Sequence, residues 1–141
     1  MKIFFKHLLY GLIGFVLFCQ NSFAQEERIS NYKVIMEVMK DRSIKVKEEL
    51  IVQVTGQRIK RGLFRSLPRS RRLHNGKSIP VRYNITNIMR DGKKERFTSK
   101  NEGGKEVLYI GQRDVILRPG QYHYTIEYLS LIHISEPTRP Y

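Results

Sequence analysis

Residues 44–54 alternate apolar and polar side chains at almost every position, and this pattern limits what the chain can fold into. Successive side chains of a β-strand point to opposite faces, so a period of two predicts an extended strand with one buried face. Glu48 is the one charged residue on the predicted inner face. Because a buried carboxylate without a partner is costly, we expect Glu48 to lie near the rim of the sheet or to pair with an arginine.

The preceding stretch, residues 29–39, alternates in the same way. One face carries Tyr32, Val34, Met36 and Val38. Ile35 and Met39 interrupt the polar face, so we expect this strand to be covered on both sides. Turn-forming residues at 41–43 separate the two runs, and two alternating runs across a short turn predict an antiparallel hairpin.

Short apolar segments separated by turns continue through the rest of the chain. The expected strands cover residues 81–89, 95–99, 107–110 and 122–128, with weak pairing at 115–117. The expected turns are Asp91-Gly92, Gly103-Gly104 and Pro119-Gly120. No window has a helical period long enough to predict a helix after the first 24 residues. The sequence therefore predicts an all-β fold, an antiparallel β-sandwich.

The first 24 residues have the organisation of an export signal. Lys2 and Lys6 precede an apolar run of about a dozen residues, which is shorter than the roughly 20 needed to span a bilayer. Ser22-Phe23-Ala24 places small residues where a signal peptidase reads. We predict a helical signal peptide over residues 1–24 and an exported protein; an uncleaved N-terminal anchor is the alternative.

The other end of the chain carries a second boundary at Tyr128. Residues 129–139 read Leu-Ser-Leu-Ile-His-Ile-Ser-Glu-Pro-Thr-Arg, which looks like the translation of a sequencing-library adapter. We therefore predict that residues 25–128 form one incomplete extracytoplasmic domain and that residues 129–141 are an adapter-derived, non-native tail. A natural, poorly ordered terminus is the alternative.

Residues 56–80 hold eight basic residues and no acidic one. We interpret them as a long basic loop in which residues 59–68 pack down, since apolar side chains are interleaved there. The candidate anion- or partner-binding residues are Arg58, Lys60, Arg61, Arg65, Arg69, Arg71 and Arg72. The alternative is a solvated loop whose arginines pair with carboxylates of the fold, such as Glu48 and Glu49.

The formal net charge of +13 favours acidic partners. An exported chain seldom meets nucleic acid, so the expected partners are anionic envelope polymers, lipid headgroups or a protein. The only cysteine, Cys19, lies in the leader, which leaves the exported part without a disulfide or a thiolate metal site. No catalytic spacing or metal motif stands out, and His74 and His123 are interpreted as surface residues. We therefore predict no enzymatic activity, no cofactor and no metal.

Four stretches together carry a family resemblance. Residues 27–29 open the first expected strand with Glu-Arg-Ile, and residues 45–49 contain Val-x-Glu. Residues 61–65 read Arg-Gly-Leu-Phe-Arg and are followed by Pro68. Residues 109–111 and 117–128 combine Tyr-Ile-Gly with Leu-x-Pro-Gly and alternating tyrosines. With these stretches the mature region resembles the amino-terminal part of a family of predicted bacterial membrane proteins, the domain of unknown function 2207 family.

The resemblance implies an extracytoplasmic β-rich domain after a signal, with transmembrane segments further on, before which this chain stops. The family has no established catalytic residues, so none is carried over. The chain departs from the family at residues 40–43, where a glycine-containing turn is usual. A purely structural reading of the signature gives Gly62 a turn, places Phe64 in the core and pairs Arg61 or Arg65 with Glu48.

These observations favour a non-enzymatic interaction or sensing domain of a membrane-anchored envelope protein, whose basic loop contacts anionic surfaces. The alternative is a structural or assembly domain whose basic segment docks on its own downstream chain or on a partner protein. In the second case replacing Arg61 or Arg65 with alanine lowers stability and leaves membrane binding unaffected.

Overall fold

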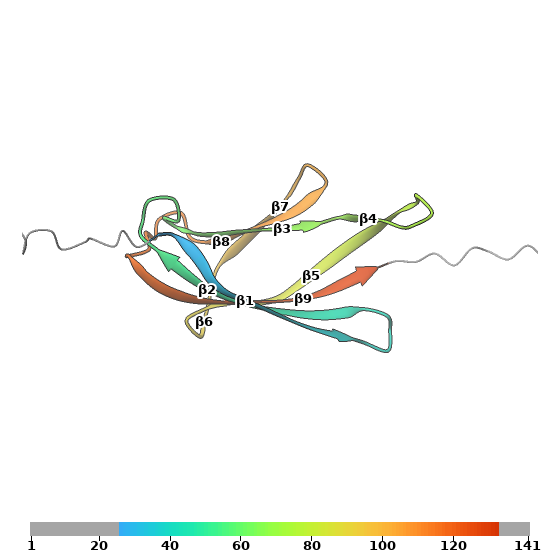
Figure 1. The fold of residues 1–141 in the computed structure, drawn as a ribbon, viewed down its shortest axis with the longest axis horizontal. Coiled ribbons are helices and arrows are strands. Elements are labelled where there is room, and N and C mark those ends of the chain that lie inside the picture. The colour runs from blue at the N-terminus through green and yellow to red at the C-terminus, as the bar shows by residue number, and fades with distance from the viewer. Residues whose placement is uncertain (1–25, 133–141) are drawn as a thin grey trace, which may run out of the picture.

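The computed structural model describes residues 26–132, and every regular element in that range is a β-strand. The predicted signal peptide and the last nine residues lie outside the described range. The strands are β1 Arg28–Val38, β2 Ile44–Val54, β3 Gly62–Pro68, β4 Ser70–Arg72, β5 Ser78–Arg90, β6 Lys93–Lys94, β7 Phe97–Glu102, β8 Lys105–Gly111 and β9 Gly120–Ile132 (Figure 1). Within this range no helix is long and apolar enough to cross a membrane.

The strands form two antiparallel sheets that face each other, which confirms the predicted all-β sandwich class (Figure 1). The larger sheet has the order β1-β2-β9-β5-β4, with β6 paired to β5, and the smaller has the order β3-β8-β7. The predicted hairpin of the first two strands is confirmed, since β1 pairs with β2 along its length. The smaller sheet covers only part of the larger one.

The core lies between the sheets and is built from the alternating faces of the sequence. Strands β2 and β9 contribute Val46, Leu50, Val52, Val54, Tyr124, Ile126 and Tyr128. The remaining members are Leu67, Ile88, Leu108, Ile110 and Leu117. Every second residue of β2 is buried, as the period of two predicts.

Strand β1 departs from its prediction, because all of its residues are exposed. The sequence indicated cover on both sides, since Ile35 and Met39 interrupt the polar face. In the structure β1 is an edge strand, with β2 as its only partner in the described part of the chain. The apolar pattern of a strand indicates which of its side chains can be buried. Whether they are buried depends on the position of the strand in the sheet.

The basic segment is not one long loop, because β3, β4 and the start of β5 lie within it. Leu67 is buried, and Ile59 and Leu63 pack partly against the core, as expected for residues that pack down. The prediction that Phe64 belongs to the core is wrong, since its side chain is 75% exposed. The inward side chains of β3 are its odd-numbered residues, so the alternation turns Phe64 outward against the ring of Tyr109, 5.0 Å away.

Two turns show how the sequence sets the hairpins. Asp91 and Gly92 both have positive φ, 51° and 74°, which is the geometry that an Asp-Gly turn favours. Between β1 and β2, Arg42 takes a φ of 68°, a left-handed conformation that residues other than glycine seldom adopt. Asp41 supports this turn by accepting hydrogen bonds from the backbone N and the hydroxyl of Ser43.

The last strand extends past the predicted boundary at Tyr128. Leu129 pairs with Lys45, and Ser130 pairs with Ile44, so both continue the ladder of β9. Of the short strand predicted at residues 95–99, only residues 97–99 are extended, as the start of β7, and residues 115–117 form no strand. The backbone N of Leu117 instead donates one hydrogen bond to Lys60 O.

Candidate functional site

The seven basic candidates do not form one surface, because β3 and β4 spread them along the molecule. Arg58, Lys60 and Arg61 precede β3, near the N-terminal end of β1. Arg65 lies in the middle of β3 and points between the sheets. Arg69, Arg71 and Arg72 follow β3, near the other end of the larger sheet. The basic residues that are neighbours in the sequence therefore form three separate groups in the structure.

The middle feature is a buried ion pair that joins the two sheets. The guanidinium of Arg65 on β3 grips the carboxylate of Glu48 on β2, with Nε to Oε2 at 2.7 Å and Nη2 to Oε1 at 2.8 Å. The Glu48 side chain is 1% exposed, and the Arg65 side chain is 34% exposed. Of the two environments expected for Glu48, the arginine pair is confirmed. Arg65 therefore acts within the fold.

Two tyrosines complete this cluster. The hydroxyl of Tyr128 donates to Glu48 Oε1 at 2.6 Å, and Arg65 Nη2 donates to the Tyr32 hydroxyl at 3.3 Å. Burial alone raises the pKa of the Glu48 carboxyl, but hydrogen bonds from Arg65 and Tyr128 favour the anion and bring this pKa below its ordinary value. Burial, together with the Glu48 charge, raises the pKa of Tyr128. At neutral pH Glu48 is thus an anion and Arg65 a cation, whereas both tyrosine hydroxyls keep their protons.

A second carboxylate, which sequence reasoning did not single out as a site, organises the loop between β2 and β3. Glu27 Oε1 accepts hydrogen bonds from the backbone N atoms of Thr55 and Gln57, and Oε2 accepts from those of Arg58 and Ile59, at 2.6–3.0 Å. Successive N–H groups that converge in this way form an anion-binding nest. The only sequence signal was the position of Glu27 at the start of the family-like stretch.

Replacing Glu27 with glutamine is expected to lower the thermal unfolding midpoint and to weaken its dependence on pH. Burial acts to raise the pKa of Glu27, but the backbone hydrogen bonds outweigh it and lower the pKa from 4.5 to about 2. The stabilisation is therefore complete above pH 4.5 and is lost as the pH falls towards 2. Thermal unfolding followed by circular dichroism between these pH values checks this. An unchanged pH slope in Glu27→Gln contradicts the assigned role.

The same end of the molecule holds a second ion pair. Arg90 Nε lies 2.9 Å from Glu95 Oε2, and the Glu95 side chain is 4% exposed. The Arg90 guanidinium also lies over the ring of Tyr122, 5.7 Å from its centre. This pair closes the Asp91-Gly92 hairpin, because its members stand on either side of that turn.

A hollow of about 330 Å³ lies beside the first basic group. Its walls include Arg58, Lys60, Arg61, Arg113, Phe64 and Tyr109. Cations and aromatic rings of this kind suit an anion, but the hollow contains no carboxylate, histidine or nucleophilic hydroxyl apart from the Tyr109 phenol. That phenol donates to Glu102.

The described residues offer no converging chemistry for a metal or a reaction. Among residues 26–132 no group of three or more histidine, aspartate and glutamate side chains is placed to hold a metal ion. The two buried carboxylates, Glu48 and Glu95, are both paired with arginine. The lowered pKa of Glu48 follows from its ion pair within the fold and does not by itself indicate catalysis.

The match to a known family now adds to this geometry. Residues 28–130 match DUF2207, the N-terminal domain of a predicted membrane protein. The chain belongs to this family. It is also 32% identical over 103 residues to the uncharacterized protein YciQ of Escherichia coli strain K12. That match covers 73% of the chain and 16% of the relative, so the chain spans about a sixth of that protein. No solved structure matches the chain.

The fold gives a physical reason for the signature at residues 61–65. Arg65 supplies the partner that Glu48 needs between the sheets. Gly62 is paired with Gly111 on β8, and the two backbones approach so closely that no side chain fits at either position. The structural reading is thus confirmed for Arg65. The turn predicted at Gly62 is wrong, because this glycine lies in β3, where it allows the close approach to Gly111.

Proposed function

We propose that this domain is the exported, non-enzymatic part of a membrane-anchored envelope protein, and that its basic hairpin tips contact the anionic lipid headgroups of the membrane. The proposal rests on one observation. The exposed cations of two hairpin turns lie at the end of the larger sheet where β9, the last strand of the family region, also ends.

The register of the strands defines this end. Val81 pairs with Ile132, and the β4–β5 turn extends beyond that pair. Ile44 pairs with Ser130, and the β1–β2 turn extends beyond it in the same direction. Polypeptide that follows β9 in a longer relative leaves from this end. Where that polypeptide leads to a membrane, the two turns face the membrane with it.

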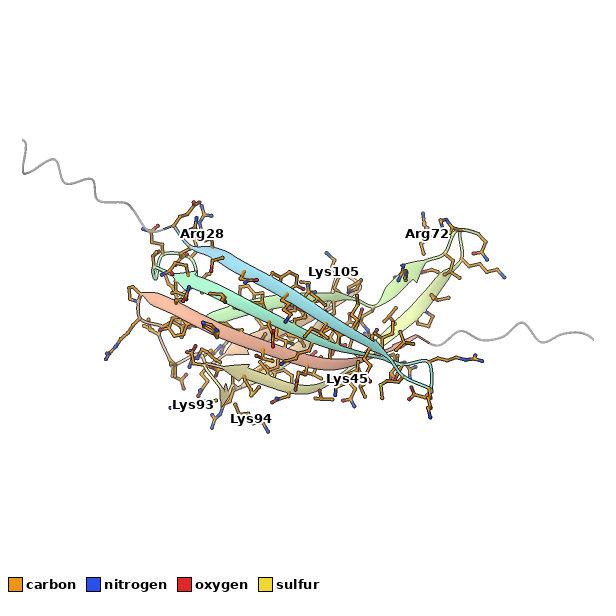
Figure 2. All side chains as sticks on the ribbon, turned by 60° about the horizontal axis from the view of Figure 1, so that its bottom comes forward. Arg28, Lys45, Arg72, Lys93, Lys94 and Lys105 are labelled. Carbon is orange, nitrogen blue, oxygen red and sulfur yellow. The ribbon has the colours of Figure 1, made fainter. Side chains whose placement is uncertain are left out.

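We call these two turns and their flanking residues the basic tips. Their cations are Lys40, Arg42, Arg71, Arg72 and Lys77, and the acidic residue among them is Asp41. No ion pair within residues 26–132 involves Arg71 or Arg72, and both are exposed. Figure 2 shows Arg72 at the far end of the molecule from Arg28, Lys93 and Lys94.

The charge at the tips is enough for weak, salt-sensitive binding. A lysine or arginine near an anionic membrane surface contributes about 1 kcal/mol, and this attraction falls off within a Debye length. Several such residues on two turns act together, whereas Arg65, which is held by Glu48 between the sheets, contributes nothing to the contact. The hollow beside Arg58 and Arg61 lies at the opposite end of the sheet and is not needed for it.

The purified chain is expected to float with vesicles of phosphatidylglycerol and phosphatidylethanolamine at low salt, and to be released at high salt. Arg71→Glu/Arg72→Glu is expected to weaken this binding about tenfold or more, because two attractive charges become repulsive. Vesicle flotation across a lipid titration measures the change.

The matched control is Lys93→Glu/Lys94→Glu, which makes the same change in net charge at the opposite end of the molecule. It is expected to bind nearly as well as the unaltered chain. Absence of binding at low salt rejects the proposal. An equal loss in both double variants also rejects it, because the net charge rather than the basic tips then drives binding.

A further inference from the structure

Strand β1 presents an unpaired edge with an unusual amount of exposed apolar surface. It is the last strand in the order of the larger sheet, and β2 is its only partner among the described residues. Met36 is 68% exposed and Val38 76%, while Val34 and Ile35 are 40% and 45% exposed. Long apolar edge strands invite pairing with another strand.

The hydrogen-bond phase of β1 shows which backbone groups are available. The backbone N of Met39 donates to Ser43 O at 2.8 Å, which marks Met39 as a residue that faces β2. Along an antiparallel strand the backbone N–H and C=O groups of successive residues point alternately to one side and the other. The odd-numbered residues of β1 therefore direct these groups towards β2, and the even-numbered residues direct them away from it. The available groups are those of Tyr32, Val34, Met36 and Val38. A partner strand must therefore pair its own outward residues with these.

We propose that β1 pairs antiparallel with β1 of a second copy of this chain, with Ile35 opposite Ile35. The ladder of β1 is regular from Asn31 to the turn at Met39, since its register shifts between Ile29 and Asn31. Ile35 is the midpoint of that regular stretch. The two-fold axis then passes through a non-hydrogen-bonded Ile35 pair, and the outward groups of both copies bond to each other.

This register places opposite charges next to each other across the whole interface. Within one copy Lys33 lies opposite Glu49, and Glu37 lies opposite Lys45. Pairing around Ile35 brings Lys33 of one copy against Glu37 of the other. Each row of side chains across the four strands then consists of Glu49 and Lys33 of one copy followed by Glu37 and Lys45 of the other, so the charges alternate in sign. Cross-strand pairs of opposite charge stabilise a sheet, and like pairs destabilise it.

Neighbouring registers lose this complementarity. When the two-fold axis passes through Lys33 or Glu37, that residue lies opposite its own copy, and like charges face each other. When the axis moves by one residue from Ile35, Lys33 and Glu37 both lie opposite uncharged residues. In the register centred on Ile35 the other face pairs Val34 with Met36 and Tyr32 with Val38. Those four side chains are the exposed apolar row of β1, so the pairing gives each of them an apolar neighbour and joins two six-stranded sheets.

The inference is independent of the proposed membrane contact, because Lys33 and Glu37 lie within the strand and outside the basic tips. Lys33→Glu and Glu37→Lys are each expected to weaken self-association at least about tenfold, because both symmetric contacts become repulsive. An equimolar mixture of the two variants is expected to form a heterodimer, because every facing pair is again opposite in sign. Sedimentation velocity over a concentration series measures both results.

Three further variants keep the test decisive. Ile35→Cys is expected to form an intermolecular disulfide under mild oxidation, because the two-fold axis places the residue opposite itself. Met39→Cys, which faces Asn31, is the control and is expected to stay reduced. Lys93→Glu is the charge control and is expected to leave self-association unchanged. A chain that is monomeric at all concentrations overturns the proposal, as does a mixture of the two charge variants that does not associate.

Discussion

Replacing Arg65 with alanine is expected to lower the free energy of unfolding by about 3–5 kcal/mol, the loss typical of a buried ion pair that keeps only one of its partners. The reason is the environment of Glu48, whose side chain is 1% exposed and receives two hydrogen bonds from the guanidinium. Without Arg65 the carboxylate remains between the sheets with no cation beside it, although the Tyr128 hydroxyl still donates to it. Urea denaturation at neutral pH measures the loss.

The matched control for this prediction is Arg61→Ala. Arg61 belongs to the same basic segment and is exposed, so its loss is expected to change stability by no more than about 0.5 kcal/mol. Similar values for the two variants contradict the assignment of Arg65 to the fold. The result also separates the two interpretations of the basic segment, because Arg65→Ala is expected to leave vesicle binding unchanged in whatever fraction stays folded.

The pH dependence of this pair has a definite sign. The pKa of Glu48 is lowered in the folded chain, so the pair contributes stability above the ordinary carboxyl pKa and loses it as the pH falls through the folded pKa. In Arg65→Ala burial acts with less opposition and raises the pKa of Glu48, so its carboxyl is protonated more readily. The difference in stability between the two proteins is therefore expected to shrink as the pH falls.

A double variant distinguishes the loss of a partner from the loss of the pair. Glu48→Gln/Arg65→Met removes both charges and keeps an acceptor for the Tyr128 hydroxyl. Because no uncompensated charge is left, it is expected to be clearly more stable than Arg65→Ala. Equal stabilities mean that the packing of the Arg65 side chain, rather than its charge, holds the two sheets together.

Local patterns predicted the parts of the fold that depend on neighbouring residues. The alternation of residues 44–54 fixed which side chains of β2 face the core, and the turn signals at 41–43 and Asp91-Gly92 marked two hairpins. The charge of Glu48 on an apolar face predicted a partner, and Arg65 was one of the two candidates. The need for a partner and the candidate arginine can both be predicted from sequence, because burying an unpaired carboxylate costs too much free energy.

Features that depend on distant strands were out of reach. The exposure of β1 follows from its place at the sheet edge, and sheet order is a long-range property. Glu27 meets its four backbone donors about thirty residues further on, with no pattern that links them. The basic segment was read as one surface because its charges are contiguous in sequence. Strands β3 and β4 instead carry those charges to both ends of the molecule and into its centre.

Gly62→Ala is expected to lower the free energy of unfolding by at least about 3 kcal/mol, and to leave little folded protein where the domain is only marginally stable. A β-carbon at this position lies 1.8 Å from the carbonyl oxygen of Ile110, which is backbone and cannot turn aside. The residue also has φ of +144°, which L side chains rarely adopt. Yield of folded protein and urea denaturation measure the effect.

Gly76→Ala separates the two causes of this loss. Gly76 has φ of +79°, but no atom lies within 4 Å of the place its β-carbon would take. It therefore carries the backbone strain without the clash, and its substitution is expected to cost about 1 kcal/mol. Gly111→Ala is expected to behave like Gly62→Ala, because its β-carbon lies 2.0 Å from the carbonyl oxygen of Arg61. Equal losses in Gly62→Ala and Gly76→Ala mean that β3 can move away from β8.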